Sequence, residues 1–391
     1  MAKSRLDALA GLRLVAAIVV AIAHLPAVSR DPALGRVAVR FLSEGLYGLT
    51  FFFVLSGFVL AYGYHERLAQ PTRAGLKSYY LARVARIWPL HLLTLGLAIL
   101  LPISPQPGGA GPLAANIFLV HAWVPDLEYI QSYNSVSWTL SIEAFFYLVC
   151  PLILWAVGRW KSAGPLALYL AAVGVWLLTC AVVWTQVDDV GIWPLYVCNV
   201  CPLVRLGEFA VGVLLGLAFV RGRVESGPAI GISARTIWTV LELVAVAIVL
   251  LLIYRSHKVP LLFRMNGYYL LVVGLLVAIF ARQRGFVSGL LGSRPAVYLS
   301  NISFAFYLLH AILFTHIGPV LPSELGAWPK AGLLILITGV AAAGLFHGVE
   351  TPLRDLIIGW GKPRSLATAY ESGLFARFVR RRFGRSRNFY Q

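Results

Sequence analysis

The first apolar segment of the sequence carries two residues, Arg13 and His24, that could bind an anion and move a proton. They are eleven residues apart, which at about 100° per residue is close to three helical turns. On a helix both would lie on one face, about 16 Å apart along its axis. A neutral imidazole can take a proton from a hydroxyl group. A lone histidine in a helix is more often a hydrogen-bonded core residue. His24 could therefore be either a base or a core residue.

Arg83 and Arg86 form a second polar pair, three positions apart where another apolar segment begins. This spacing places their guanidinium groups side by side on one face of a helix. Each group is planar and matches the oxygen atoms of a phosphate. The pair therefore suits phosphate binding. The simpler alternative is that both residues anchor the helix end to lipid headgroups on the cytoplasmic side.

Glu143 lies about one turn inside the segment that begins at Trp138, at a depth similar to that of His24. A carboxylate beside an imidazole fixes its tautomer and stabilises the imidazolium ion that forms when it takes a proton. We therefore predict that Glu143 orients His24. Arg205 and Glu208 lie three residues apart in another segment, and an ion pair within the helix is their simplest interpretation.

Polar residues also mark the last two apolar segments. Ser303, Tyr307 and His310 follow the spacing i, i+4, i+7 and would form one stripe on a helix. His310 is a second candidate for imidazole chemistry, and a hydrogen-bonded packing role fits its position equally well. Glu350 and Arg354 are four residues apart and are predicted to form a helix salt bridge.

The sequence lacks the usual signatures of metal and serine chemistry. It contains no H-E-x-x-H motif, and no His or carboxylate pair has dedicated ligand spacing, so we expect no metal. It contains no G-x-S-x-G motif for a serine nucleophile. Cys198 and Cys201 form a C-x-x-C pair. Redox motifs of this kind occur beside βαβ patterns, and the sequence has none, so a redox role is not expected. The chemistry that remains is a histidine base with phosphate-compatible arginines.

The composition indicates which elements hold these residues. The chain has 391 residues, of which 59% are hydrophobic and 13% are charged, and its mean hydropathy is +0.79. Soluble domains contain about 45–50% apolar residues. We therefore predict an all-α membrane protein, a polytopic bundle of transmembrane helices.

Ten apolar runs are long enough to cross the roughly 30 Å hydrocarbon core of a bilayer as helices. Another run, at 113–124, is too short to cross and is predicted to be re-entrant or interfacial. The first run is not expected to be a cleaved signal peptide, because it is long and contains Arg13. The ten runs are 8–28, 45–64, 86–101, 138–157, 165–187, 202–220, 237–254, 267–281, 298–321 and 331–349.

Basic residues are distributed unevenly over the predicted loops. With the N-terminus inside, 24 of the 33 Lys and Arg residues lie on the cytoplasmic side and seven in outer loops. Cytoplasmic loops carry an excess of basic residues, so both termini are predicted to be cytoplasmic. We predict a transmembrane domain at 1–358 and a basic cytoplasmic tail at 359–391 that contacts membrane lipids. The net charge of +17 then reports topology, and nucleic-acid binding is not expected.

Several motifs in order resemble those of the acyltransferase 3 family of membrane acyltransferases. The resemblance runs from Gly11 to about Arg354, and Phe304 stands where tyrosine is common. The motifs are the arginine-ten residues-histidine pattern of Arg13 and His24, the run from Phe52 to Phe58, Arg83-x-x-Arg86 through His91, Ser137 to Glu143 with Phe146, Tyr147 and Pro151, Ile302 to His310, and Glu350-Thr351-Pro352.

The resemblance implies ten transmembrane helices in a bacterial cytoplasmic (inner) membrane. It also implies an acyl-CoA co-substrate and O-acylation, usually O-acetylation, of envelope carbohydrates or glycolipids. Essential roles follow for the residues that match His24, Arg13, Arg83 and Arg86. Further residues are predicted to contact substrate or support the site: Trp138, Ser141, Arg205, Glu208, Ser303, Tyr307, His310 and Glu350.

These expectations combine into a mechanism. Arg83 and Arg86, helped by Arg13, would hold the phosphates of coenzyme A near the cytoplasmic face. His24, oriented by Glu143, would deprotonate the acceptor hydroxyl as it attacks the thioester. A covalent acyl-histidine relay is a variant of this mechanism.

Two other classes of function compete with an enzyme. A secondary transporter of sugars or organic anions would also place polar residues inside the bundle. A scaffold that binds partners through its tail would leave the charges within the membrane without a role. The acceptor, the acyl chain length and the oligomeric state stay open.

Overall fold

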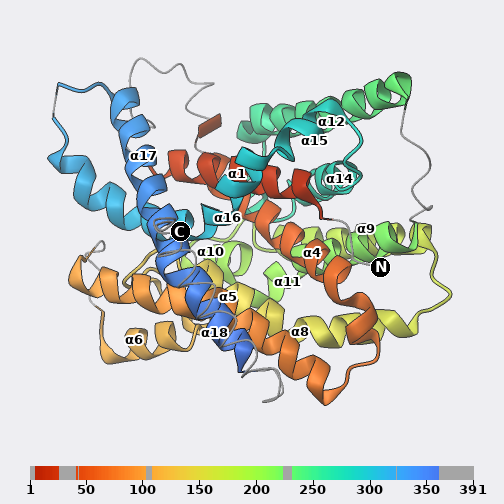
Figure 1. Cartoon of the computed structure of the whole chain (residues 1–391), viewed down its shortest axis with the longest axis horizontal. Coiled ribbons are helices and arrows are strands. Elements are labelled where there is room, and N and C mark those ends of the chain that lie inside the picture. The colour runs from red at the N-terminus through yellow and green to blue at the C-terminus, as the bar shows by residue number, and fades with distance from the viewer. Residues whose placement is uncertain are drawn as a thin grey trace, which may run out of the picture.

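The computed structural model describes residues 5–25, 41–42, 44–102, 108–222, 231–322 and 324–360. Within these ranges the chain is helical and has no strand, which confirms the predicted all-α polytopic bundle (Figure 1). The predicted basic tail after residue 360 and the outer-loop arginines Arg30, Arg36 and Arg40 lie outside the described residues.

Long helices and short connecting elements alternate along the chain. The longer helices are α1 (Asp7–Ala23), α4 (Leu49–Ala69), α5 (Arg73–Leu100), α8 (Trp138–Arg159), α9 (Pro165–Trp184), α11 (Pro202–Arg221), α12 (Ile232–Arg255), α14 (Leu270–Phe280), α16 (Arg294–Ile317) and α17 (Ala327–Leu345). The shorter elements are η1 (Glu44–Gly48), α6 (Ala110–Ile117), η2 (His121–Trp123), α7 (Leu127–Ile130), α10 (Ile192–Leu195), η3 (Tyr196–Val200), η4 (Ser256–Lys258), α13 (Leu261–Met265), α15 (Phe286–Leu291), η5 (Gly318–Val320), η6 (Phe346–Glu350) and α18 (Thr351–Gly359).

Eight helical stretches of the described chain are long and apolar enough to cross a membrane. Helix α1, with 17 residues, and α4, which ends in polar residues, are not among them. Both correspond to predicted spans, so the count of ten and the cytoplasmic termini stay predictions. The eight stretches are Arg73–Leu100, Trp138–Arg159, Pro165–Trp184, Ile192–Arg221, Ile232–Lys258, Leu261–Phe280, Arg294–Val320 and Ala327–Gly359.

Helix α5 differs most from expectation, because it begins at Arg73 and the third span was predicted to begin at Arg86. Thr72 caps this helix, since its side-chain oxygen accepts a hydrogen bond from Gly75 N at 3.1 Å. The first turns of α5 are polar and basic, so a hydropathy pattern does not reveal them. Arg83 and Arg86 consequently lie well inside a helix of 28 residues.

The apolar run at 113–124 folds as α6 followed by η2, and neither is long enough to cross a bilayer. Ser141 of α8 holds this segment in place, because its hydroxyl donates to Leu119 O at 2.7 Å and accepts from Ala122 N at 3.3 Å. His121 in η2 is buried. Burial, with a smaller effect from His91, lowers the pKa of His121 to about 4.

Helices α4 and α11 approach with their backbones almost in contact. A Cβ atom at Gly57 would lie 2.1 Å from Phe209 O, and one at Gly212 would lie 2.0 Å from Val54 O. Small residues let membrane helices pack this closely. The contact fixes the position of α4 within the bundle.

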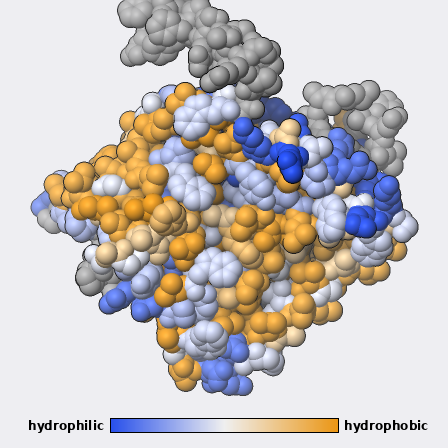
Figure 2. Space-filling view, turned by 90° about the horizontal axis from the view of Figure 1, so that it is seen from below, coloured by the Kyte–Doolittle hydropathy of each residue, from blue (hydrophilic) through white to orange (hydrophobic). Residues whose placement is uncertain are grey.

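The outer surface of the bundle is largely apolar. Helices α9, α12 and α17 have few buried residues and expose many large apolar side chains. Figure 2 shows apolar residues over much of one face, with hydrophilic residues gathered toward its margins. A lipid bilayer supplies the apolar surroundings that such a surface requires. The chain is therefore a multi-pass membrane protein.

Candidate active site

A cavity of about 200 Å³ lies between α1, α4, α5, α8 and α16. Its wall combines charged groups with many apolar side chains. Six residues that the sequence singled out line it: Arg13, Arg83, Arg86, Glu143, Ser303 and Tyr307. The other lining residues are Leu49, Phe52, Phe53, Leu55, Ser56, Val59, Leu60, Thr139, Leu140, Tyr147 and Phe304.

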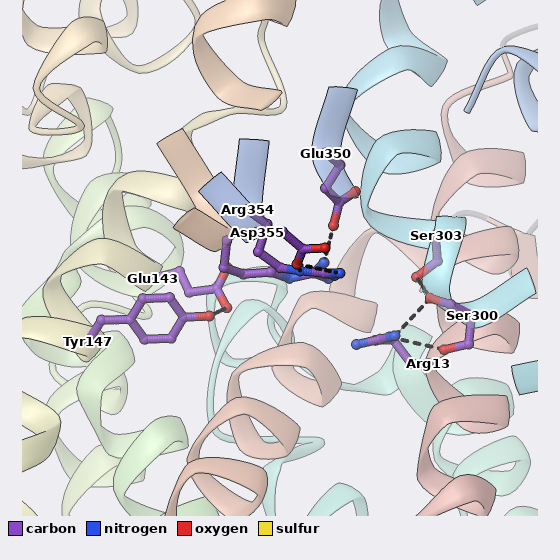
Figure 3. A network of polar contacts seen from close by, with 9 residues as sticks. Arg13, Glu143, Tyr147, Ser300, Ser303, Glu350, Arg354 and Asp355 are labelled. Carbon is purple, nitrogen blue, oxygen red and sulfur yellow. Dashed lines mark hydrogen bonds and ion pairs between the residues drawn. The ribbon is translucent and has the colours of Figure 1, made fainter. Parts of the chain in front are cut away.

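Arg13 reaches the cavity from α1 and is held by α16. Its Nε donates to Ser300 Oγ at 3.1 Å, and its Nη2 donates to Ser300 O at 2.7 Å (Figure 3). Ser303 Oγ also donates to Ser300 O, at 2.8 Å. One turn of α16 therefore fixes the direction of the Arg13 guanidinium.

Arg83 lies among three tyrosine rings. Its guanidinium carbon is 5.5 Å from the ring centroid of Tyr64, 5.9 Å from that of Tyr79 and 5.3 Å from that of Tyr147. Cation–π attraction stabilises a guanidinium in such a position. Its Nη2 donates to the Tyr64 hydroxyl at 3.3 Å, and its buried Nε has no hydrogen-bond partner among the described residues. The Arg83 side chain thus keeps a donor for a ligand.

Arg86 forms an ion pair with Glu350 of η6 and lies 4.7 Å from the Phe304 ring centroid. The predicted salt bridge between Glu350 and Arg354 is wrong, because Arg354 pairs with Asp355 at 3.4 Å (Figure 3). The physical reason is burial, because the Glu350 side chain is 1% exposed and pairs with Arg86 of α5, whereas the Arg354 side chain is 33% exposed.

Glu143 accepts a hydrogen bond from the Tyr147 hydroxyl, one turn further along α8, and one from Ser56 Oγ at 3.5 Å. The predicted contact between Glu143 and His24 is not made within the described part of the chain. A similar depth in the membrane did not bring these two side chains together. Glu143 instead faces the cavity beside the arginines.

His24 lies at the end of α1, where its Nδ1 donates to Val20 O at 2.8 Å. Its ring meets that of His310 on α16 edge to face, with centroids 5.0 Å apart. Arg13 and His24 both contact α16, through Ser300 and His310, which confirms that they share a face of α1. His24 does not line the cavity itself.

Tyr307 lies between His310 and the cavity. Its ring centroid is 5.5 Å from that of His310, and its hydroxyl is 3.1 Å from both Val136 O and Thr139 Oγ1. Tyr307 and Thr139 line the cavity. The polar stripe predicted on this helix therefore extends from the cavity to His24.

The comparison with known protein families decides the class of this molecule. Residues 6–347 match the family whose description is acyltransferase domain. The chain belongs to the acyltransferase 3 family.

Individual members of the family extend this match. Acyltransferase MdmB of Streptomyces mycarofaciens is 30% identical over 93% of this chain and 95% of its own. Peptidoglycan O-acetyltransferase OatA of Listeria monocytogenes is 24% identical over 85% of this chain, which spans 56% of OatA. No solved structure matches the chain significantly.

Some predicted residues of this acyltransferase 3 chain lie away from the cavity. Arg205 and Glu208 form the predicted ion pair on α11, with Nη1 and Oε1 2.8 Å apart, and Thr50 donates to the same Glu208 oxygen at 2.7 Å. Trp138 packs against the hydrophobic core. Ser141 fixes the loop before α8, as described above. These residues support the fold around the site.

Other contributors had no signal in the sequence. Ser300, Ser56 and Tyr64 come from different helices than the groups they contact. Glu143 and Tyr147 are four residues apart on one helix, and so are Tyr79 and Arg83, so this spacing would have revealed both contacts in advance.

Proposed function

We propose that this protein transfers an acyl group from acyl-CoA to a hydroxyl group of an envelope carbohydrate or glycolipid, in the inner membrane of a bacterium. Membership of the acyltransferase 3 family supports the reaction class. The observation that carries the proposal is the convergence of three arginines on one cavity inside the bundle. The name of the relative OatA supports O-acetylation of a cell-wall polymer.

The charges around the cavity favour an anionic donor. Arg13, Arg83 and Arg86 contribute three guanidinium groups, whereas Glu143 and Glu350 contribute two carboxylates. The phosphates of coenzyme A would add the missing negative charge. Planar guanidinium groups bind phosphate oxygens through paired hydrogen bonds, and Arg83 Nε is available for this purpose.

His24 is the proposed general base. Because its Nδ1 donates to Val20 O, the lone pair of the neutral ring lies on Nε2. This nitrogen takes the proton of the acceptor hydroxyl as the hydroxyl oxygen bonds to the thioester carbon. The carbon–sulfur bond then breaks, and the proton passes from His24 to the sulfur. A positioned base of this kind contributes about 10²–10⁴-fold to a rate.

The experiment uses the full chain reconstituted in lipid nanodiscs with radiolabelled acetyl-CoA and an extract of envelope glycans and glycolipids. We expect label to move to an extracted molecule whose mass increases by one acetyl group. Movement of sugars or organic anions across vesicles without loss of acetyl-CoA would support a transporter and overturn the proposal. Label retained on the protein itself would indicate the acyl-histidine relay.

A further inference from the structure

His310 is the buried neighbour of His24, and the mechanism above does not use its chemistry. The two ring planes meet at 70° with centroids 5.0 Å apart. His310 is fully buried on α16, whereas His24, at the end of α1, is partly buried. The packing of α1 against α16 thus brings a second imidazole to the proposed base.

The hydrogen bonds of His310 define its tautomer. Its Nδ1 lies 2.5 Å from Tyr307 O. A carbonyl oxygen can only accept, so Nδ1 is the donor and Nε2 of the neutral ring carries a lone pair. This buried Nε2 has no partner within the described part of the chain. Buried acceptors are normally satisfied, so His310 holds an unused acceptor beside His24.

His24 has the same tautomer, because its Nδ1 donates to Val20 O. Once His24 Nε2 takes a proton, the new N–H is a donor that needs an acceptor. Glu143 is not the acceptor for this N–H, since its carboxylate already accepts hydrogen bonds from Tyr147 and Ser56. His310 Nε2 is an acceptor on the adjoining ring.

We propose that His310 is a positioning residue for acyl transfer, whose Nε2 accepts a hydrogen bond from protonated His24. This inference rests on the proposed function. The proton moves from the hydroxyl to His24 Nε2 and then to the leaving sulfur, while an oxygen–carbon bond forms and a carbon–sulfur bond breaks. His310 gains no proton. It stabilises the imidazolium ion of His24 between the two transfers.

If His310 only packed against its neighbours, substitutions at this position would have different effects on transfer. The His310 ring lies parallel to Phe306, with centroids 6.4 Å apart, and edge to face with Phe314 at 5.6 Å. A phenylalanine at position 310 would preserve aromatic packing and remove the lone pair. A glutamine would do the reverse, because its side-chain oxygen accepts hydrogen bonds. The two substitutions therefore separate the roles.

The test compares His310→Phe and His310→Gln with the wild-type protein, in nanodiscs and with the radiolabelled assay described above. We expect His310→Phe to lower kcat by at least about tenfold with little change in the KM for acetyl-CoA. His310→Gln should retain most of the wild-type kcat. In a His24→Ala background, His310→Phe should cause no further loss, because the two residues act as a unit.

Wild-type kcat in His310→Phe, or a larger loss in His310→Gln than in His310→Phe, would overturn the role of His310. His310→Leu provides a second apolar variant in case the phenylalanine does not fit, and acetyl-CoA binding verifies that each variant is folded. The two proposals fail in different ways. No transfer by the wild-type protein overturns the proposed function, whereas equal transfer by wild type and His310→Phe overturns only the inference on His310.

Discussion

Arg86 of α5 and Glu350 of the π-turn η6 form an ion pair in which Glu350 is almost completely buried. The second carboxylate oxygen of Glu350 has no hydrogen-bond partner among the described residues. Arg86 faces the cavity. Glu350 therefore occupies one side of a guanidinium group that a phosphate would also use, and the two anions compete for it.

Removal of this competing charge should tighten donor binding. We predict that Glu350→Gln lowers the Kd for coenzyme A by about threefold to tenfold, which corresponds to about 0.7–1.4 kcal/mol. Isothermal titration in nanodiscs measures this change. Asp355→Asn is the control, because Asp355 pairs with Arg354 and does not line the cavity. Weaker binding by Glu350→Gln would show that the carboxylate supports the donor site.

Arg83 should not tolerate lysine. An ammonium group retains the charge but loses the planar set of donors and the fit among three tyrosine rings. We expect Arg83→Lys to raise the KM for acetyl-CoA by about tenfold, since a hydrogen bond to a charged group contributes about 1.5–3 kcal/mol. Arg73→Lys, at an exposed position of the same helix, is the matched control. An unchanged KM in Arg83→Lys would place the phosphates elsewhere.

Because α4 and α11 are in close contact, we predict that one added methyl group at their interface lowers the stability of the protein strongly. Gly57→Ala would bring a Cβ atom against Phe209 O, and such overpacking costs about 1–3 kcal/mol. Gly63→Ala on the same helix meets nothing within 4 Å and should be neutral or slightly stabilising. Thermal unfolding in detergent compares the two variants. Equal unfolding temperatures would contradict the close packing.

His121 should make the stability of the protein sensitive to acid. Burial lowers its pKa in the folded protein to about 4 from an ordinary value of 6.5. Above pH 6.5 the His121 ring is neutral in both the folded and the unfolded protein. As the pH falls from 6.5 toward 4, the unfolded chain takes a proton that the folded protein resists, so the free energy of unfolding decreases. Unfolding temperatures across this range should fall less in His121→Gln than in the wild-type protein, and parallel curves would exclude the effect.

Local patterns predicted much of this structure. Hydropathy located the core of each long helix, and the spacing of Arg13 and His24 correctly assigned them to one face, because helical periodicity depends only on neighbours along the chain. The polar start of α5 was missed, since its first turns lack the apolar signal that identified the other helices.

Contacts between helices were harder to predict. Glu143 and His24 were expected to meet because of their depth, but Glu143 contacts Ser56 of α4 and Tyr147 of its own helix. Glu350 was assigned to Arg354 by α-helical spacing, but its buried carboxylate pairs with Arg86 of α5. Both errors concern contacts between helices, and tertiary packing determines those contacts.

In the proposed mechanism His24 performs the chemistry while the arginines bind the donor. This mechanism is tested most directly by measuring both acetyl transfer and coenzyme A binding in His24→Ala, with His316→Ala on α16 as a control outside the cavity. We predict that His24→Ala loses at least about 100-fold in transfer rate and binds coenzyme A with the wild-type Kd. Transfer by His24→Ala at the wild-type rate would contradict the account.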